Sequence, residues 1–500
     1  MGGEDHRCAW RERVEQLEGE LATTRAELAA SQDKIAGLAA NLEKLQRHVF
    51  GQRSEKMPRV ADELRQAGVE TDPEATQEKR RENAEKRRQL PTRRIDHKVP
   101  EAQRTCPKCG GHDFTPLGEG KLTEIFELVP SRVERQLHVQ EKLRCRCGET
   151  ILLAEGPAKV FDKTRFGPNF MAQVVVSKCA DSIPLYRQAK AYRRIGVPVD
   201  DSTLGNMFHH VAEITAPLSN RLLEIIPEKD IVLADETTQR VQAKKKTRTA
   251  WLWSFIARDE REKELIGYVF SKSRSGETPV KVLADTIGKL LVDGYQGYDG
   301  VIVPGGRVRA GCIAHSRRKF FEALSSAPEA ARKAMDYVLE IYKVERAALD
   351  AGLLGTPQHL AMRQARSKPV MEEFKAWLEA EQPRHPPKSA IGSAISYALG
   401  QWDALTLFLT DPHLPVDNNA SENALRVAAL GRTNFLFVGN DTAGEHLAGL
   451  DSLVMTCEAN GVNPIAYLAD VLMRVQTHPA SRIDELLPQN WTPPGTGPSA

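Results

Sequence analysis

An acidic residue inside an apolar strand pattern constrains this chain more than any other feature. The stretch "DIVLADETTQRVQ", residues 230–242, opens with an apolar run, reaches adjacent carboxylates at Asp235 and Glu236, and continues with strand-forming residues. Burying a charged carboxylate is costly unless a neighbouring group compensates the charge. A divalent cation does so, because it neutralises carboxylates and replaces their lost hydration. The pattern therefore predicts a metal-ligating acid within a buried strand.

The order of patterned segments after residue 230 predicts one type of fold. Three strand patterns are followed by an amphipathic helix, two strands and another helix, at 231–242, 250–259, 265–273, 278–287, 289–295, 310–315 and 316–324. Three antiparallel strands followed by alternating helix and strand is the order of the ribonuclease H-like fold. We therefore expect a catalytic domain of this class over 229–447, with a helical insertion at about 322–410.

Two acids of this domain are expected to converge. The first and fourth strands of a ribonuclease H-like sheet lie side by side, which brings Asp235 next to Asp293 although 58 positions separate them. Adjacent buried carboxylates repel each other, and a bound Mg²⁺ or Mn²⁺ ion would relieve that repulsion. Asp299, in "GYDG", is the alternative to Asp293, but it follows a turn, where an acid is more often a turn residue.

A third acid would let the site hold two metal ions on a scissile phosphate. The candidate is Glu422, in the first turns of a helix that Asp417 or Asn418 can cap. Arg426 and Arg432 follow on the same segment and are candidate DNA contacts. An acid followed by arginine one turn later is also typical of an ordinary surface pair, so this segment alone leaves both interpretations open.

A histidine and three basic residues follow the fifth strand pattern. His315 is expected at the strand end close to the acids, where it either orients a phosphate or a metal-bound water, or packs as an ordinary strand-end histidine. Cys312 is expected in the core. Arg317, Arg318 and Lys319 open the next helix, where they either reach DNA phosphates or form a solvated basic turn.

The N-terminal region has a heptad repeat. Apolar residues recur every seven positions, at Val14, Leu21, Leu28, Ile35, Leu42 and Val49. The repeat predicts a coiled coil over 1–56 and hence a homo-oligomer, the alternative being a long helix packed on its own domain. Residues 57–100 read as a charged linker. Its basic run at 79–94 is either a solvated segment or an arm that contacts phosphates.

Half of the eight cysteines fall into two close pairs. These cysteines are Cys106, Cys109, Cys145 and Cys147. Paired thiolates separated by a loop can close a tetrahedral zinc site, and each pair is followed by a glycine that allows a tight turn. We expect a small zinc-binding β module over 101–160. The second pair has the tighter C-x-C spacing, so His112 or His138 could replace one of its ligands.

Residues 161–228 are helical in pattern. The segment "PLYRQAKAYRRIGVPVDDSTLGNMFHHVAEI" predicts two helices separated at Gly196, the second capped by Asp201 or Ser202. The first helix is rich in arginine and lysine, so the pair is either a helix-turn-helix that binds DNA or an ordinary helical pair. No segment has the apolar length of a membrane span, and the start lacks a signal peptide, so we expect a cytoplasmic protein.

Several segments, taken together and in this order, resemble the transposase of the insertion-sequence 66 family. They are "HVFGQRSEK", "CPKCGG", "PLYRQAKAYRRIGV", "LADETTQRV", "VDGYQGYDG", "GCIAHSRRKFFEA", "DNNASENALRVAALGRTNFLFVGND" and "ANGVNPIAYLADVLMRV". The resemblance implies a DDE transposase whose acidic triad is Asp235, Asp293 and Glu422. It also implies the zinc module, a C-terminal helical element at 448–490, and companion proteins from the same element as possible partners. Asn423 departs from the family, where a basic residue is common.

Two functions from different classes follow. The first is a multidomain α+β transposase that binds insertion-sequence ends and cleaves and joins double-stranded DNA. Such a protein would be bacterial and associated with the nucleoid when it is bound to DNA. The alternative is a catalytically silent DNA-binding regulator derived from a transposase. All three acids are present, which favours the enzyme. A structure-selective nuclease on the same fold would need neither the coil nor an end-binding module.

Overall fold

The computed structural model describes residues 133–144, 151–162, 164–244 and 246–493, together with short stretches between residues 13 and 85. The chain forms two compact units, Met1–Glu63 and Leu64–Ala500. Most of the heptad repeat, His112 and all four cysteines of the predicted zinc site lie outside the described residues. Within the predicted charged linker, the structure contains a short helix, α2 (Val60–Gln66), with two acids in its first turn.

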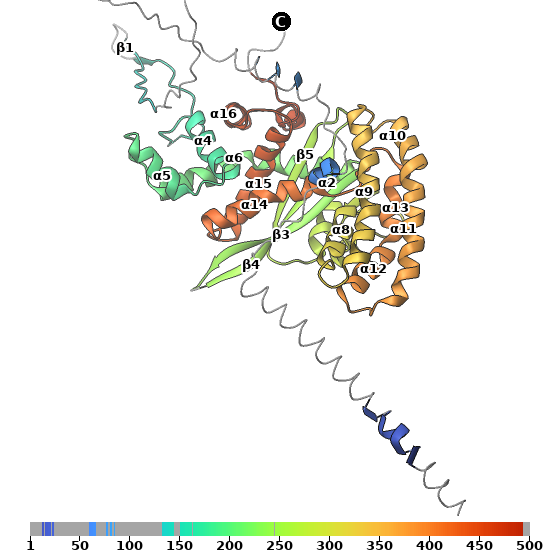
Figure 1. Ribbon diagram of the computed structural model, residues 1–500. Helices are drawn as coiled ribbons and strands as arrows, with labels where there is room; N and C mark the ends of the chain where they lie inside the picture. The colour runs from blue at the N-terminus through green and yellow to red at the C-terminus, as the bar shows by residue number, and fades with distance from the viewer. Residues whose placement is uncertain are drawn as a thin grey trace, which may run out of the picture. The chain divides into compact units, whose positions relative to one another are not determined.

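A mixed five-stranded sheet lies at the centre of the larger unit (Figure 1). Its strands are β3 (Ile231–Ala243), β4 (Lys246–Arg258), β5 (Glu264–Ser271), β6 (Gly288–Val292) and β7 (Arg307–Gly311). Their order is β5-β4-β3-β6-β7; β3, β4 and β5 pair antiparallel, whereas β6 and β7 run parallel to β3. A separate antiparallel pair joins β1 (Lys142–Arg144) to β2 (Ile151–Leu153).

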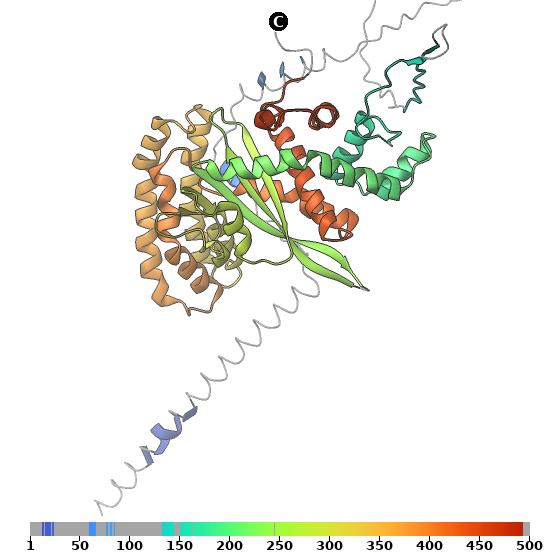
Figure 2. The ribbon, with the colours of Figure 1, turned by 180° about the vertical axis from the view of Figure 1, so that it is seen from behind.

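The described helices surround this sheet. They are α4 (Pro168–Cys179), α5 (Leu185–Arg194), α6 (Asp201–Ile225), α7 (Glu277–Leu283), α8 (Ile313–Glu322), α9 (Pro328–Asp350), α10 (Pro357–Met362), α11 (Lys368–Glu381), α12 (Ala390–Gly400), α13 (Trp402–Thr406), α14 (Asn419–Phe435), α15 (Asp441–Ala459) and α16 (Pro464–Arg474). Both ribbon views show α9 to α13 gathered at the β7 side of the sheet and α4, α6, α15 and α16 at the β5 side (Figures 1 and 2). Among the described helices, none is long and apolar enough to cross a membrane.

Several predicted boundaries were wrong. The last strand was expected over 310–315, but β7 ends at Gly311, because its partner strand β6 ends at Val292, the residue paired with Gly311. Helix α8 begins at Ile313, two residues after the end of β7 and earlier than expected. Cys312 is therefore the N-cap residue, and His315 lies inside the helix rather than at a strand end. The helix that was expected to reach Ile287 ends at Leu283.

The two faces of the sheet are covered by different helices. Side chains alternate along a strand, so Ala234 and Phe255 share one face while Asp235 and Tyr268 share the other. The first face joins the main core, where Gly267 lies so close to Leu223 of α6 that an added Cβ would approach it within 2.6 Å. On the second face the Tyr268 hydroxyl donates to the Ala424 carbonyl at 2.8 Å, which ties α14 to β5 on the face that carries Asp235.

Helix α15 covers the free edge of β5 with polar side chains. Thr456 Oγ1 both accepts from the Ile266 N–H and donates to the Ile266 carbonyl, each at 3.1 Å. Ser452 accepts from the Tyr268 N–H at 2.8 Å. Asn460 accepts from the Glu264 N–H at 3.1 Å. An uncovered strand edge invites pairing with another chain, so these side chains complete the hydrogen bonding of the sheet.

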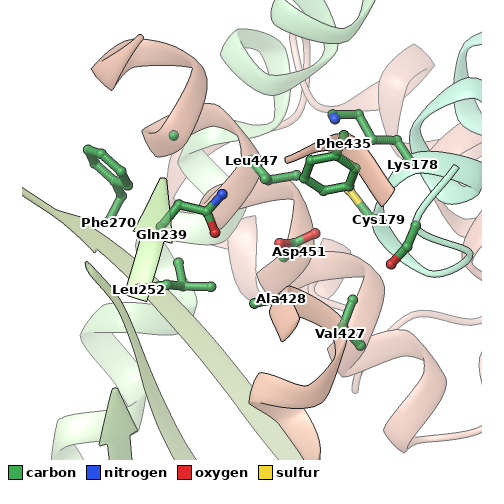
Figure 3. A pocket seen from close by; sticks show the side chains of 12 residues that line it. Lys178, Cys179, Gln239, Leu252, Phe270, Val427, Ala428, Phe435, Leu447 and Asp451 are labelled. Atoms are coloured by element: carbon green, nitrogen blue, oxygen red, sulfur yellow. The ribbon is translucent and has the colours of Figure 1, made fainter. Parts of the chain in front are cut away.

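A small cavity lies between the sheet and helices α4, α14 and α15 (Figure 3). Its walls include the buried carboxyl of Asp451, whose pKa is raised to about 7 by burial, and Lys178, whose ammonium lies 4.1 Å from the ring centre of Phe435. The cavity measures about 10 Å³, which is room for about one water molecule. It is therefore a packing feature and too small for a substrate.

Candidate active site

The strand register brings the first two predicted acids to the same level of the sheet. Leu233 of β3 pairs in parallel with Leu291 of β6. Two residues further along the chain in each case, Asp235 and Asp293 therefore come to the same level. Asp293 follows β6 directly and its Oδ1 accepts from the Tyr295 N–H at 2.8 Å. The two acids therefore lie side by side where β6 ends.

The carboxyl of Asp235 lies in an environment that disfavours its charge. Burial raises its pKa to about 7, and the negative charges of Glu236, Asp293 and Glu422 add to this effect. A hydrogen bond from the Glu236 N–H to Asp235 Oδ1, at 2.8 Å, opposes the increase. Asp293 and Glu422 thus lie within electrostatic reach of Asp235, although the three acids come from different elements: the end of β6, α14 and β3.

The start of α14 is held against β3. Asn418 is the N-cap residue, but its side chain reaches across to donate to the Ala234 carbonyl at 2.8 Å, one residue before Asp235. Asp417 accepts from the Tyr342 hydroxyl at 2.7 Å and from the Asn419 N–H at 3.1 Å. These contacts fix the first turn of α14, and with it Glu422, beside the strand acids.

Glu422 faces helix α8. Its Oε2 lies 3.3 Å from the Arg318 guanidinium, and its Oε1 lies 3.8 Å from His315 Nδ1. Neither Glu422 Oε1 nor His315 Nδ1 has a hydrogen-bond partner among the described residues, although both atoms are buried. Buried polar atoms are normally paired, so this part of the site is suited to a further polar group or ion.

Carboxylate oxygens are the ligands that Mg²⁺ and Mn²⁺ prefer, so the donor chemistry of these acids fits such ions. Within the part of the chain that the structure describes, however, no three His, Cys, Asp or Glu side chains are arranged to hold one metal ion. Each acid is instead turned to a protein partner: the Glu236 N–H, the Tyr295 N–H and Arg318. The acids are near one another but not in a ligating arrangement.

The alternative acid lies apart from this group. The side chain of Asp299 is 65% exposed and pairs with Arg309 at 2.7 Å in the turn after the strand. Asp293, by contrast, follows the strand paired with β3, and its charge adds to the raised pKa of Asp235. The geometry therefore favours Asp293 over Asp299 as the partner of Asp235.

Comparison with known proteins identifies the family. Residues 163–446, more than half of the chain, match the family described as "Transposase IS66 family". The chain belongs to this IS66 transposase family. Flanking segments match further parts of IS66 transposases: the "zinc-finger binding domain of transposase IS66" at 103–148, the "IS66 C-terminal element" at 452–489, and "Transposase C of IS166 homeodomain" at 37–100. The predicted resemblance is confirmed, and a transposase family implies DNA as the partner.

Three relatives from Sinorhizobium fredii (strain NBRC 101917 / NGR234) are similar over most of their length. "Uncharacterized protein y4hP" is 31% identical, with 91% of this chain and 89% of the relative covered. "Uncharacterized protein y4jD" is 34% identical, covering 81% and 82%. "Uncharacterized protein y4qI" is 31% identical, covering 98% and 95%. The IS66 zinc-finger match spans all four cysteines of the predicted zinc site, which is consistent with zinc binding.

One buried ion pair beside the candidate site was missed by the sequence analysis. The Glu236 side chain is only 2% exposed; it is neutralised by Arg274, whose Nε lies 2.8 Å from Oε1, and it accepts from the Tyr298 hydroxyl at 2.7 Å. The Arg274 guanidinium also lies 3.9 Å from the ring centre of Tyr295. No periodic pattern links Arg274 to Glu236, 38 positions away, so only the folded chain reveals the pair.

The basic residues of α8 occupy different environments. Arg317 is 1% exposed, which does not fit the predicted contact with DNA phosphate. Arg317 lies on the face of α8 that points into the protein. Three consecutive basic residues in the sequence do not reveal which of them faces inward. Arg318 and Lys319 are exposed, and the Lys319 ammonium lies 4.6 Å from the ring centre of Tyr397.

The arginines of α14 also differ from each other. Arg426 is exposed, in agreement with a surface that could meet DNA. Arg432 is partly buried and donates to the carbonyl and hydroxyl of Thr238 at 2.7 and 2.6 Å. Arg432 therefore fastens α14 to β3, three residues beyond Asp235.

The helical pair before the sheet has a turn at the predicted place. Gly196 adopts a φ of 84°, which favours glycine, between α5 and α6. The cap of α6 is Asp200, whose Oδ1 accepts from the Thr203 N–H at 2.7 Å, and not Asp201 or Ser202 as predicted. Helix α5 exposes all of its basic side chains, which are Arg187, Lys190, Arg193 and Arg194.

Proposed function

We propose that this protein cleaves and joins DNA strands at the ends of an insertion sequence, with Asp235, Asp293 and Glu422 as a DDE triad. The observation that carries the proposal is the parallel register of β3 with β6, which supports Asp235 and Asp293 as neighbours. Burial raises the pKa of Asp235, and the charges of Asp293 and Glu422 add to that effect. Buried like charges are destabilising unless a cation joins them. An arrangement that costs stability in the metal-free chain is typical of a functional site.

The three carboxylates would hold Mg²⁺ or Mn²⁺. When bound, such ions activate the attacking water or 3′ hydroxyl and stabilise the leaving oxygen of an in-line displacement at phosphorus. Arg318 is placed to neutralise Glu422 or a DNA phosphate, since its side chain is 46% exposed. His315 Nδ1, buried and unpaired among the described residues, would orient a phosphate oxygen or a water molecule.

The proposed architecture separates a catalytic domain from parts that bind DNA or join protomers. The sheet order, with β6 parallel to β3 and a helical stretch after α8, is that expected of a ribonuclease H-like domain at 229–447 with an insertion at about 322–410. We assign end recognition to the zinc module at 101–160 and the helical pair at 161–228. The coil at 1–56 would join protomers.

Nicking of DNA tests the proposal directly. The wild-type chain, supplied with the element's ends, Mg²⁺ and any companion proteins, should nick the strands at those ends. Replacement of Asp235, Asp293 or Glu422 by Ala should reduce nicking to background while DNA binding persists, because each change removes a carboxylate that the metal needs. Asp299→Ala is the matched control and should retain nicking.

Two outcomes would overturn parts of this proposal. Undiminished nicking by Asp293→Ala, with loss in Asp299→Ala, would move the second acid to Asp299. A wild-type chain that binds the ends but never nicks them in Mg²⁺ or Mn²⁺ would favour the alternative, a catalytically silent regulator derived from a transposase.

A further inference from the structure

Strands β3 and β4 continue as a two-stranded ribbon beyond their neighbours in the sheet. Strand β5 pairs with β4 only from Trp251 onward, and β6 pairs with β3 only as far as Leu233. The pairing of β3 with β4 nevertheless continues to Ala243 opposite Lys246. Figure 2 shows the two strands projecting past the rest of the sheet. We call residues 239–250 the ribbon.

The ribbon is anchored to the segment that follows α14 through the edge of β3 and through one of its faces. Val241 forms a bridge with Val438: the Gln242 N–H donates to the Val438 carbonyl at 2.8 Å, and the Val438 N–H donates to the Arg240 carbonyl at 2.9 Å. Arg248, which lies opposite Val241, forms an ion pair with Asp441 at the start of α15. These contacts give the ribbon a defined direction relative to α14.

The opposite face is polar. Arg240 pairs with Thr249 and Gln242 pairs with Thr247, so these four side chains share one face. Arg240, Gln242 and Thr249 are exposed, as are Lys244 and Lys246 at the tip. This face therefore presents hydrogen-bonding and cationic side chains to solvent.

The charge of the ribbon is strongly one-sided. Residues 239–250 read "QRVQAKKKTRTA" and contain no Asp or Glu, although the whole chain has a formal net charge of only +2. The basic residues of the ribbon are Arg240, Lys244, Lys245, Lys246 and Arg248. The charge of Arg248 is offset by Asp441, which leaves the tip and the polar face as a cationic surface.

We propose that the ribbon binds duplex DNA beside the cleavage site, with Lys244 and Lys246 at phosphates and the polar face of Arg240 along a groove. This inference rests on the proposed function, because DNA must already lie at the acidic site. The major groove of B-DNA admits a two-stranded β-ribbon, and phosphate contacts come mainly from lysine and arginine. An acidic protein partner would need no such elongated shape.

The geometry fixes how far from the cut the contacts should fall. Arg240 lies five residues beyond Asp235 on the same strand, which is about 17 Å at 3.3 Å per residue. The tip at Lys244 lies about 30 Å from Asp235 by the same rise. At 3.4 Å per base pair, the ribbon would contact DNA about five to nine base pairs from the scissile phosphate.

Salt-dependent binding tests the proposal. The K244Q/K246Q double variant of the full chain is compared with wild type on a 30-base-pair duplex in EDTA, where no cleavage occurs. Log affinity falls as log salt concentration rises, and each phosphate contact adds about 0.9 to the steepness of that fall. The variant has lost two contacts, so its plot should be less steep by about 2. K368Q/K388Q removes two exposed lysines of the helical stretch after α8 and should keep the wild-type slope.

Acetylation of the unmodified protein provides a second measurement. Bound duplex should protect Lys244 and Lys246 from a lysine-acetylating reagent, whereas Lys368 and Lys388 should react equally with and without DNA. If wild type binds and nicks DNA, but K244Q/K246Q keeps the full slope and the ribbon lysines stay reactive, the ribbon inference is wrong and the proposed function stands. If wild type fails to bind duplex DNA, both fail.

Discussion

At the scale of single residues, Asp235 is the position where stability and proposed function conflict. Its pKa is raised to about 7, so the folded protein binds a proton there that the unfolded chain releases near pH 4. The stabilising effect of the neutral carboxyl is complete below about pH 4 and is lost as the pH rises through about 7. We expect Asp235→Asn to raise the free energy of unfolding above pH 7 by about 1–4 kcal/mol in EDTA.

Thermal melts from pH 4 to 8 check this expectation. Wild type should lose stability as the pH rises, whereas Asp235→Asn, which cannot ionise, should show a flatter profile. Added Mg²⁺ or Mn²⁺ should raise the Tm of wild type more than that of the variant, because a cation relieves the repulsion only where the carboxylates exist. Asp299→Asn, at an exposed acid paired with Arg309, is the control. A wild-type profile as flat as that of Asp235→Asn would contradict the expectation.

At the scale of elements, the edge of β5 depends on α15. Thr456 is fully buried, and its hydroxyl satisfies both the N–H and the carbonyl of Ile266. Thr456→Val keeps the shape but leaves both backbone groups unpaired, so we expect a loss of about 1–3 kcal/mol. Urea unfolding should show a lower midpoint with an unchanged m value. Thr433→Val, on the exposed face of α14, should change stability by less than about 0.5 kcal/mol.

The elements also show what local sequence patterns can and cannot predict. The strands of the sheet were predictable, because alternation and β-branched residues have a local cause, and their order brought Asp235 and Asp293 together. The end of β7 depends on the end of its partner β6, which no local pattern encodes. Likewise, the burial of Arg317 and the pairing of Arg274 with Glu236 arise from tertiary packing.

At the scale of the whole molecule, the N-terminal heptads predict self-association. The described heptad residues Val14 and Leu21 are 48% and 52% exposed in the single chain. Apolar residues at such positions are normally buried by a partner helix. Light scattering should therefore give the full chain at least twice the monomer mass, and a chain that begins at Met57 should have a smaller oligomer number. Equal oligomer numbers would refute the role of the coil.

We expect zinc at the cysteine pairs and Mg²⁺ or Mn²⁺ at the carboxylates of the catalytic domain. Thiolate pairs bind zinc in closed structural sites, whereas carboxylates bind Mg²⁺ or Mn²⁺. Metal analysis of purified protein should find about one zinc per chain, by the four-ligand count, and C106S/C109S should lose it. Full zinc retention by that variant would exclude the cysteine site.

The same double variant separates end recognition from catalysis. If the zinc module recognises the ends, C106S/C109S should bind end sequences poorly but still nick non-specific DNA in Mn²⁺, because the acids on β3, after β6 and on α14 do not depend on those thiolates. Asp235→Ala should show the converse, with full zinc, intact end binding and no nicking. Loss of all nicking by a folded C106S/C109S protein would instead mean that the module contributes to the catalytic assembly itself. End binding equal to wild type would assign recognition to the helical pair α5 and α6.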